Sequence, residues 1–283
     1  MTRHGTTVGL LHPGSMGAAF GSRLTARGIT VLWCPDGRSE ASGERARHAG
    51  LKAAALPSLL DHADVLLSLC PPAAATEVAA LVASHGFAER TYVEANAISP
   101  ERVGLIAALL PGAETIDASV VGSPPVGGKT ATLYLAGEQT RTEAVERLFA
   151  GTDIHTHSLG TEVGAASALK LAYSSYQKAS RVLAALSYGA AQAHGVGDEL
   201  LAIAAKRTGS YLTETGYIPK TAARAWRWGP ELADAAALLS DAGLPDELML
   251  AAAATLERWD AARDTRLSVE EALKLLRRDP EEG

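Results

Sequence analysis

Near its N-terminus the chain reads Thr7-Val8-Gly9-Leu10-Leu11-His12-Pro13-Gly14-Ser15-Met16-Gly17. Its apolar beginning predicts a strand over Thr7–Leu11, and helical spacing follows over Met16–Arg27. A strand that enters a helix through a glycine turn resembles the G-x-G-x-x-G pattern of dinucleotide-binding units, here with histidine in the first position. Gly14 would let the backbone approach a pyrophosphate, and Gly17 would let helix and strand pack closely.

This turn is a candidate phosphate site. The helix should begin near Ser15 and point its free backbone N–H groups at an anion. Pro13 could stiffen the turn in place of the missing first glycine. The alternative is a plain strand-to-helix turn without a ligand. The residues that we expect to contact the cofactor here are His12, Pro13, Gly14, Ser15, Met16 and Gly17.

The end of the second expected strand, Thr30–Cys34, bears on the choice of cofactor. An acidic residue at this point binds the ribose diol of NAD, whereas an arginine accommodates the 2′-phosphate of NADP. Both types occur, as Asp36 and Arg38. Arg38 and Ser39 could hold a phosphate through a guanidinium fork and a hydroxyl. We therefore expect NADP(H), with NAD(H) possible; the alternative for Ser39 is a helix N-cap in a solvated turn.

The first half of the chain alternates short apolar runs with helical segments, among them Ala73–Ser84 and Pro100–Leu110. Such alternation predicts a parallel sheet with crossover helices, and hence an α/β Rossmann-type domain over residues 1–159. The further strands that we expect are Asp64–Cys70, Thr91–Ala95, Glu114–Ala118, Thr132–Ala136 and Ile154–His157.

The pattern changes near residue 160. Thr161–His194 contains no proline and has apolar residues at helical spacing, so we expect a long interdomain helix that stops at Gly195. No strand pattern follows, which predicts an all-α domain over residues 160–283. Ser268–Glu271 has the spacing of a capping box. Helix breaks are expected at Gly216, Pro219, Gly229-Pro230 and Gly243-Leu244-Pro245.

Composition narrows the class of protein. The net charge of −6 over 283 residues argues against a general nucleic-acid binder, which needs basic residues to neutralise phosphates. No apolar run approaches the roughly 20 residues of a membrane span. Cys34 and Cys70 are too few for a disulfide framework and are expected to be reduced thiols. The reduced thiols and the lack of a membrane span lead us to expect a cytoplasmic protein. We expect no metal, because His155 and His157 lack a third ligand.

Taken together, the motifs resemble those of the 6-phosphogluconate dehydrogenase / β-hydroxyacid dehydrogenase superfamily, in a branch with its own helical C-terminal domain. The resemblance extends over nearly the whole chain. Its markers are His12–Gly17, Leu69–Pro72, Glu94–Pro100, Asp117–Gly122, Gly160-x3-Gly164-x5-Lys170, Ser167–Tyr173, Trp226–Trp228 and Gly243–Pro245.

The resemblance implies that Lys170 is a general acid in carbonyl reduction and a base in the reverse direction. The chemistry requires such a group, because hydride transfer to a carbonyl carbon leaves an alkoxide that must be protonated. An ammonium group in a partly desolvated pocket can stabilise that charge. The alternative is a lysine that extends along an amphipathic helix face to reach water. Members of this shape also pair their helical domains, so the resemblance implies that residues 160–283 form a substrate and dimerisation domain, and we expect a homodimer.

The resemblance further implies that Asn96 contacts the nicotinamide ribose or the substrate, and that Cys70, Pro71 and Pro72 shape the loop over the cofactor. Asn96 could instead be a turn residue bonded to its own backbone, and the prolines could simply start a helix. On the substrate side, the expected contacts are Gly122, Ser123, Tyr173 and Ser174.

Two departures from the superfamily pattern affect the substrate rather than the reaction. Ser174 replaces a common asparagine, and Val121-Gly122-Ser123-Pro124-Pro125 replaces a serine-glycine-glycine turn. The chain is also short for 6-phosphogluconate itself, which we do not expect as its substrate. The leading hypothesis is an NADP-dependent dehydrogenase or reductase of a small hydroxy acid. The alternatives are an imine reductase on the same scaffold, which Lys170 disfavours, and a non-catalytic NADP-binding protein.

Overall fold

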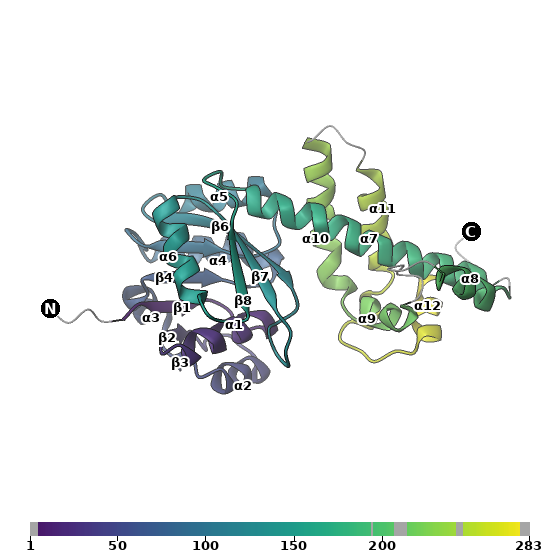
Figure 1. The fold of residues 1–283 in the computed structure, drawn as a ribbon, viewed down its shortest axis with the longest axis horizontal. Coiled ribbons are helices and arrows are strands. Elements are labelled where there is room, and N and C mark those ends of the chain that lie inside the picture. The colour runs from purple at the N-terminus through teal and green to yellow at the C-terminus, as the bar shows by residue number, and fades with distance from the viewer. Residues whose placement is uncertain (1–4, 194, 207–213, 242–245, 278–283) are drawn as a thin grey trace. The chain divides into compact units, whose positions relative to one another are not determined.

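The computed structural model describes residues 5–193, 195–206, 214–241 and 246–277 (Figure 1). The chain divides into two compact units, residues 1–170 and 171–283. The boundary therefore falls inside the long helix α7 (Ala165–Ala193), whereas the sequence suggested a boundary before that helix. The first turns of α7 count with the first unit because hydrogen bonds tie them to its sheet.

The first unit is built on one sheet with the strand order β3-β2-β1-β4-β5-β6-β7-β8. All neighbouring strands are parallel except β6 and β7, which are antiparallel. This is the doubly wound order of a Rossmann domain, with its reversal between β1 and β4, and it confirms the expected fold class. The strands are β1 (Thr7–Leu10), β2 (Thr30–Trp33), β3 (Lys52–Ala53), β4 (Val65–Ser68), β5 (Thr91–Glu94), β6 (Glu114–Gly122), β7 (Ala131–Ala136) and β8 (Ile154–Ser158).

The register of the central strands places several chain segments along one edge. Leu10 pairs with Leu67, Leu67 with Val93, and Val93 with Ile116, so these four residues form one row across the sheet. The segments that follow them emerge at the carboxyl edge of the parallel strands. Ligands of open α/β sheets bind at this edge, next to the reversal of strand order.

Helices cover both faces of the sheet, and each face has its own buried cluster. Successive strand residues point to opposite faces, so Leu67 packs with Phe20 and Phe149 while Leu66 packs with Leu59 and Ile106. The helical elements of this unit are α1 (Ser15–Ala26), α2 (Glu40–His48), α3 (Leu56–His62), the 3₁₀ turn η1 (Pro72–Ala74), α4 (Ala75–Ser84), α5 (Pro100–Leu109) and α6 (Gln139–Phe149).

The second unit is helical throughout its described residues. Its core surrounds Trp259, which is fully buried and donates its indole N–H to the carbonyl of Ala272 at 2.7 Å. Besides most of α7, the elements are α8 (Gly197–Ala204), η3 (Thr215–Tyr217), α9 (Ile218–Ala222), α10 (Ala225–Asp241), α11 (Glu247–Glu257), η4 (Asp260–Ala262) and α12 (Val269–Leu276). In the described part of the chain, no helix is both long and apolar enough to cross a membrane.

Most of the helix caps and helix ends predicted from the sequence are present in the structure. Ser99 caps α5 ahead of Pro100, Ser268 and Glu271 form the capping box of α12, and Gly195 has a positive φ just after α7. The expected break at Gly229-Pro230 is wrong, because Pro230 lies inside α10. Gly229 has no Cβ to clash with the proline ring, so the helix can continue through it. The expected break at 243–245 lies outside the described residues.

Candidate active site

The glycine turn presents an open helix N-terminus. Gly14 is the N-cap of α1, with extended backbone and no side-chain cap, and the first helical bond runs from Ala18 N to Gly14 O at 2.8 Å. The N–H groups of the residues between them therefore have no acceptor within the helix. A Cβ added to Gly17 would overlap the backbone oxygen of His12, so only glycine fits there. The turn has the geometry expected of a phosphate site.

Two arginines hold this turn from the side of α2. Arg38 donates to the carbonyl of Leu11 at 3.0 Å and contacts Nδ1 of His12 at 3.1 Å. Its Nε is buried and has no hydrogen-bond partner among the described residues. Arg45, which sequence reasoning did not single out, donates to the carbonyl of Pro13 at 3.0 Å. Positive charge is thus concentrated beside the turn, as an anionic ligand would require.

Ser39 has a local structural role. Its side chain accepts a hydrogen bond from the backbone N–H of Ser42 at 3.3 Å and so caps α2. The hydroxyl of Ser42 lies 3.1 Å from that of Ser39 and accepts from Arg45 at 2.9 Å. The N-cap alternative for Ser39 therefore describes this structure, and its contact with a cofactor phosphate stays a prediction.

Asn96 sits in a buried polar cluster at the carboxyl ends of β4 and β5. Its backbone N–H donates to Oε1 of Glu94 at 3.0 Å, and its side-chain amide donates to the same oxygen. The amide also reaches the hydroxyl of Ser68 at 3.0 Å and the sulfur of Cys70 at 3.4 Å. The side chain is thus bonded to its neighbours rather than to its own backbone as a free turn asparagine would be.

Glu94 is the residue of this cluster that sequence reasoning missed. It is fully buried, and this burial raises its pKa to about 7 although Asn96 and Ser68 hydrogen bonds oppose the shift. The burial of Cys70, followed by the nearby Glu94 charge, raises the pKa of its thiol to about 11, which keeps it neutral at physiological pH. An acid within the apolar run of β5 was the available sequence signal, since buried charges need partners.

Lys170 lies in the second turn of α7. Burial lowers its pKa to about 8, so the amine can gain and lose a proton near neutral pH. The start of its helix is held by the fully buried Asp117 of β6. Asp117 accepts from the N–H of Gly164 at 2.9 Å, the N–H of Ser167 at 3.0 Å and the hydroxyl of Ser167 at 2.6 Å.

The residues expected to contact the substrate differ in exposure and in their hydrogen bonds. Gly122 ends β6 with a positive φ, and Ser123 is exposed in the loop after it. Tyr173 is exposed and accepts a hydrogen bond from Gln177 at 3.2 Å. Ser174 is buried, and its hydroxyl has no hydrogen-bond partner in the described part of the chain. Pro72 begins η1, as a helix-start proline would, and its carbonyl accepts from Arg102 at 2.9 Å.

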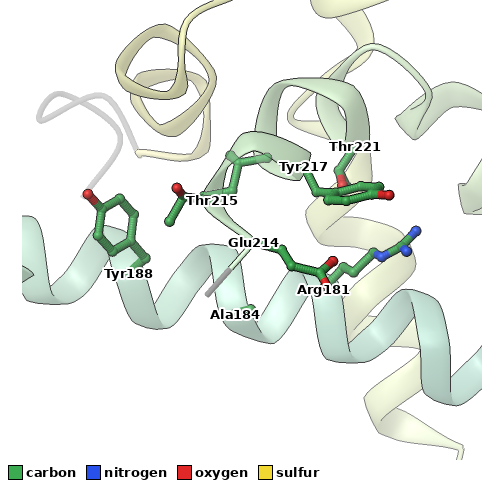
Figure 2. A pocket seen from close by; sticks show the side chains of 8 residues that line it. Arg181, Ala184, Tyr188, Glu214, Thr215, Tyr217 and Thr221 are labelled. Carbon is green, nitrogen blue, oxygen red and sulfur yellow. The ribbon is translucent and has the colours of Figure 1, made fainter. Parts of the chain in front are cut away.

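A small pocket in the second unit was not expected (Figure 2). The Arg181 guanidinium lies 4.6 Å from the Tyr217 ring centroid and approaches it as a cation–π pair. The pocket is lined by Arg181, Ala184, Tyr188, Glu214, Thr215, Tyr217, Ile218 and Thr221.

In the described residues, no three His, Cys, Asp or Glu side chains gather into a possible metal site.

The sheet order and the open glycine turn define a Rossmann-type domain followed by a helical domain. Residues 191–259 match the model of a domain family of unknown function, DUF1932. No curated protein matches the chain by sequence.

Solved structures extend this comparison over the whole chain. The 3-hydroxyisobutyrate dehydrogenase of Mycobacterium tuberculosis, with L-serine, has a TM-score of 0.74 at 19% identity and covers 96% of this chain and 99% of its own. The Salmonella typhimurium 3-hydroxyisobutyrate dehydrogenase has a TM-score of 0.74 at 17% identity, covering 95% and 99%. A reductive aminase of Aspergillus terreus, with NADPH and ethyl levulinate, has a TM-score of 0.59 at 20% identity, covering 96% and 99%.

These similarities identify the fold. The fold that the sequence resemblance implied, a Rossmann domain followed by a helical domain, is confirmed.

Proposed function

We propose that this protein is an NADP(H)-dependent oxidoreductase that transfers hydride between the nicotinamide and a small hydroxy acid or its carbonyl form. The observation that carries the proposal is the half-buried Lys170, whose pKa is lowered to about 8, on a helix anchored to a dinucleotide-type sheet. General acid–base groups work best when their pKa lies near the working pH.

The residues around the glycine turn suit a dinucleotide. The free N–H groups at the start of α1 are suited to a pyrophosphate, and Gly17 lets the helix pack closely against the backbone of His12. The buried, unpartnered Nε of Arg38 supports its assignment to the 2′-phosphate of NADP(H). Asn96, with Cys70, Pro71 and Pro72 before it, would lie along the nicotinamide ribose. The bound cofactor would supply the hydride in reduction and accept it in oxidation.

Lys170 would manage the proton. In reduction its ammonium group stabilises negative charge on the substrate oxygen and then protonates that oxygen. In oxidation the neutral amine accepts the hydroxyl proton. Because the pKa is about 8, the protonated form dominates below that pH and the neutral form above it. Reduction should therefore decline, and oxidation improve, as pH rises through about 8.

For the substrate, the proposal names a class of compound, the small hydroxy acids, and the residues that would bind it. Gly122 and Ser123 would bind the carboxylate of a small acid through backbone N–H groups, and Tyr173 and Ser174 would contact its oxygens. The similar M. tuberculosis structure contains L-serine, which is itself a small hydroxy acid. The similarity to a reductive aminase with NADPH supports imine reduction as a second candidate, although Lys170 favours the carbonyl reaction.

The test follows NADPH absorbance with a panel of small 2- and 3-oxo acids, each with and without added amine. We expect turnover on oxo acids alone. Lys170→Met should lower kcat about 100- to 10,000-fold, the usual contribution of a general acid, while NADPH still binds. Lys129→Met, at an exposed loop lysine, is the control.

Three results would overturn parts of the proposal. Unchanged kcat in Lys170→Met would remove the assigned acid. Turnover only with added amine would favour the imine reductase. Tight NADPH binding with no turnover on any substrate would favour a non-catalytic NADP-binding protein.

The homodimer and the cytoplasmic location stay predictions.

A further inference from the structure

Helix α7 begins without a capping side chain of its own. The residue before its first turn is Gly164, which has a positive φ of 107° and cannot accept a hydrogen bond through a side chain. The N–H groups in the first turn of a helix need acceptors when they are buried. Here Asp117, 50 residues before Ser167 in the chain, supplies them from β6.

Both oxygens of the Asp117 carboxylate accept hydrogen bonds from the start of α7. One oxygen accepts from two backbone N–H groups and the other accepts from the hydroxyl of Ser167. Burial raises the pKa of Asp117 above its ordinary value, although the hydrogen bonds from the helix start oppose this shift. A carboxylate at this position also interacts favourably with the positive end of the helix dipole.

A second contact fixes the same point from another side. A Cβ added to Gly164 would lie 3.0 Å from the Cβ of Pro100, the first residue of α5. The start of α7 is therefore confined between β6 and α5, close in sequence to the Asn96 segment. Neither contact is available to an exposed helix end, which would fray.

The direction of Lys170 depends on this start. Lys170 follows Ser167 by three residues, within one helical turn of the Asp117 contact. With 3.6 residues per turn, a shift of the helix by one residue would rotate the lysine by roughly 100°. A general acid must be held within hydrogen-bond reach of the atom that it protonates.

We propose that Asp117 is a positioning residue for Lys170: its carboxylate fixes where α7 begins and thereby where the lysine amine points. The inference rests on the proposed function of Lys170 as the general acid. Ser167 contributes to the same anchor through its hydroxyl.

The experiment compares Asp117→Leu, Asp117→Asn and Ser167→Ala in the full-length protein. Leucine removes every acceptor. Asparagine keeps one oxygen for both N–H groups and can donate its amide to the Ser167 hydroxyl, so it is the conservative rescue. Ser167→Ala removes a single bond and covers the case in which Asp117→Leu does not fold. Glu138→Leu is the control, because the Glu138 carboxylate caps α6, which carries no lysine of the site.

Two readouts are used: the titration of Lys170 by NMR of ¹⁵N-labelled lysine, assigned with Lys170→Arg, and kcat at saturating NADPH. In Asp117→Leu we expect the Lys170 pKa to rise toward its ordinary value and kcat to fall about 100-fold, as for a misplaced catalytic group. Asp117→Asn should stay close to the parent, and Ser167→Ala should show the same changes in smaller measure. Glu138→Leu should change thermal stability only.

An unchanged Lys170 titration and kcat in Asp117→Leu, or in Ser167→Ala if the former does not fold, would overturn the proposal. Equal damage from Asp117→Leu and Glu138→Leu would also overturn it. If the parent protein turns over no carbonyl substrate, the proposed function fails, while a shifted Lys170 titration in Asp117→Leu still supports the positioning role.

Discussion

Two buried carboxylates on neighbouring strands illustrate how single residues acquire their chemistry here. Glu94 and Asp117 pair directly in the register of β5 and β6, and both are fully buried. Glu94 accepts from Asn96, whereas Asp117 accepts from the start of α7. Their different roles come from their partners, because a buried carboxylate is tolerated only where hydrogen bonds replace water.

Arg38 offers a test of cofactor choice at the level of one residue. We expect Arg38→Ala to weaken NADPH binding about 10- to 100-fold more than NADH binding, since a hydrogen bond to a charged group contributes about 1.5–3 kcal/mol. Fluorescence titration with both cofactors measures this ratio.

Arg47→Ala is the control, because this arginine is exposed on α2, the helix that follows Arg38. Arg38 also contacts His12 and Leu11, so its loss could disturb the turn itself. Equal weakening of NADPH and NADH would mean that Arg38 only supports the turn.

At the level of elements, the strand–turn–helix unit β1–α1 is the part on which the proposed cofactor binding depends. Its geometry relies on Gly17, where the backbone of His12 leaves no space for a side chain. The neighbouring β4 and β5 ends contribute the polar cluster around Asn96. These elements meet because their strands are parallel and in register at one edge.

Gly17→Ala should abolish NADPH binding, because the added Cβ would clash with the His12 backbone, force the turn open and displace the N–H groups proposed to bind the phosphate. Isothermal titration with NADPH would measure the loss. Gly104→Ala is a matched control inside α5, where an added Cβ meets nothing within 4 Å. It should bind normally and gain roughly 0.5–1 kcal/mol of stability from the better helix former. Normal NADPH affinity in Gly17→Ala would rule out the assigned turn.

At the level of the whole molecule, the two units have separate hydrophobic cores. The core of the second unit includes a buried ion pair, Lys178–Glu231, in which the residues are only 6% and 7% exposed. The Lys178 amine also lies 5.6 Å from the centroid of the Trp228 ring. Damage at this pair should therefore affect the stability of the second unit without altering the glycine turn in the first.

Lys178→Met should destabilise the second unit by about 3–5 kcal/mol, because it leaves Glu231 buried without its partner. The double variant Lys178→Met/Glu231→Leu should recover most of that loss. Urea unfolding followed by tryptophan fluorescence reports mainly on this unit, which contains Trp226, Trp228 and Trp259. Lys274→Met, at an exposed lysine, is the control. A Lys178→Met loss no larger than that of the control, or a loss of NADPH binding, would contradict this account.

Local chemistry was readable from the chain because it depends on near neighbours. The glycine turn, the Ser99 and Ser268 caps and the length of α7 follow from short-range patterns, and the structure has all of them. The two-residue strand β3 and the seven-residue helix α3 were missed, because neither is long enough to show a period. The helix break predicted at Pro230 was wrong because the preceding Gly229 has no Cβ to clash with the proline ring, so α10 continues through it.

The pairing of distant groups required the folded chain. Asp117 was visible in a motif, yet its bonds to Gly164 and Ser167 span 47 and 50 residues of sequence. The raised pKa of Glu94 and the lowered pKa of Lys170 likewise arise from burial, which sheet formation and helix packing create. Residue order thus set the turns, caps and strand–helix alternation through local sterics and hydrogen bonding. Only the packed fold decided which charges lost their water and which partners replaced it.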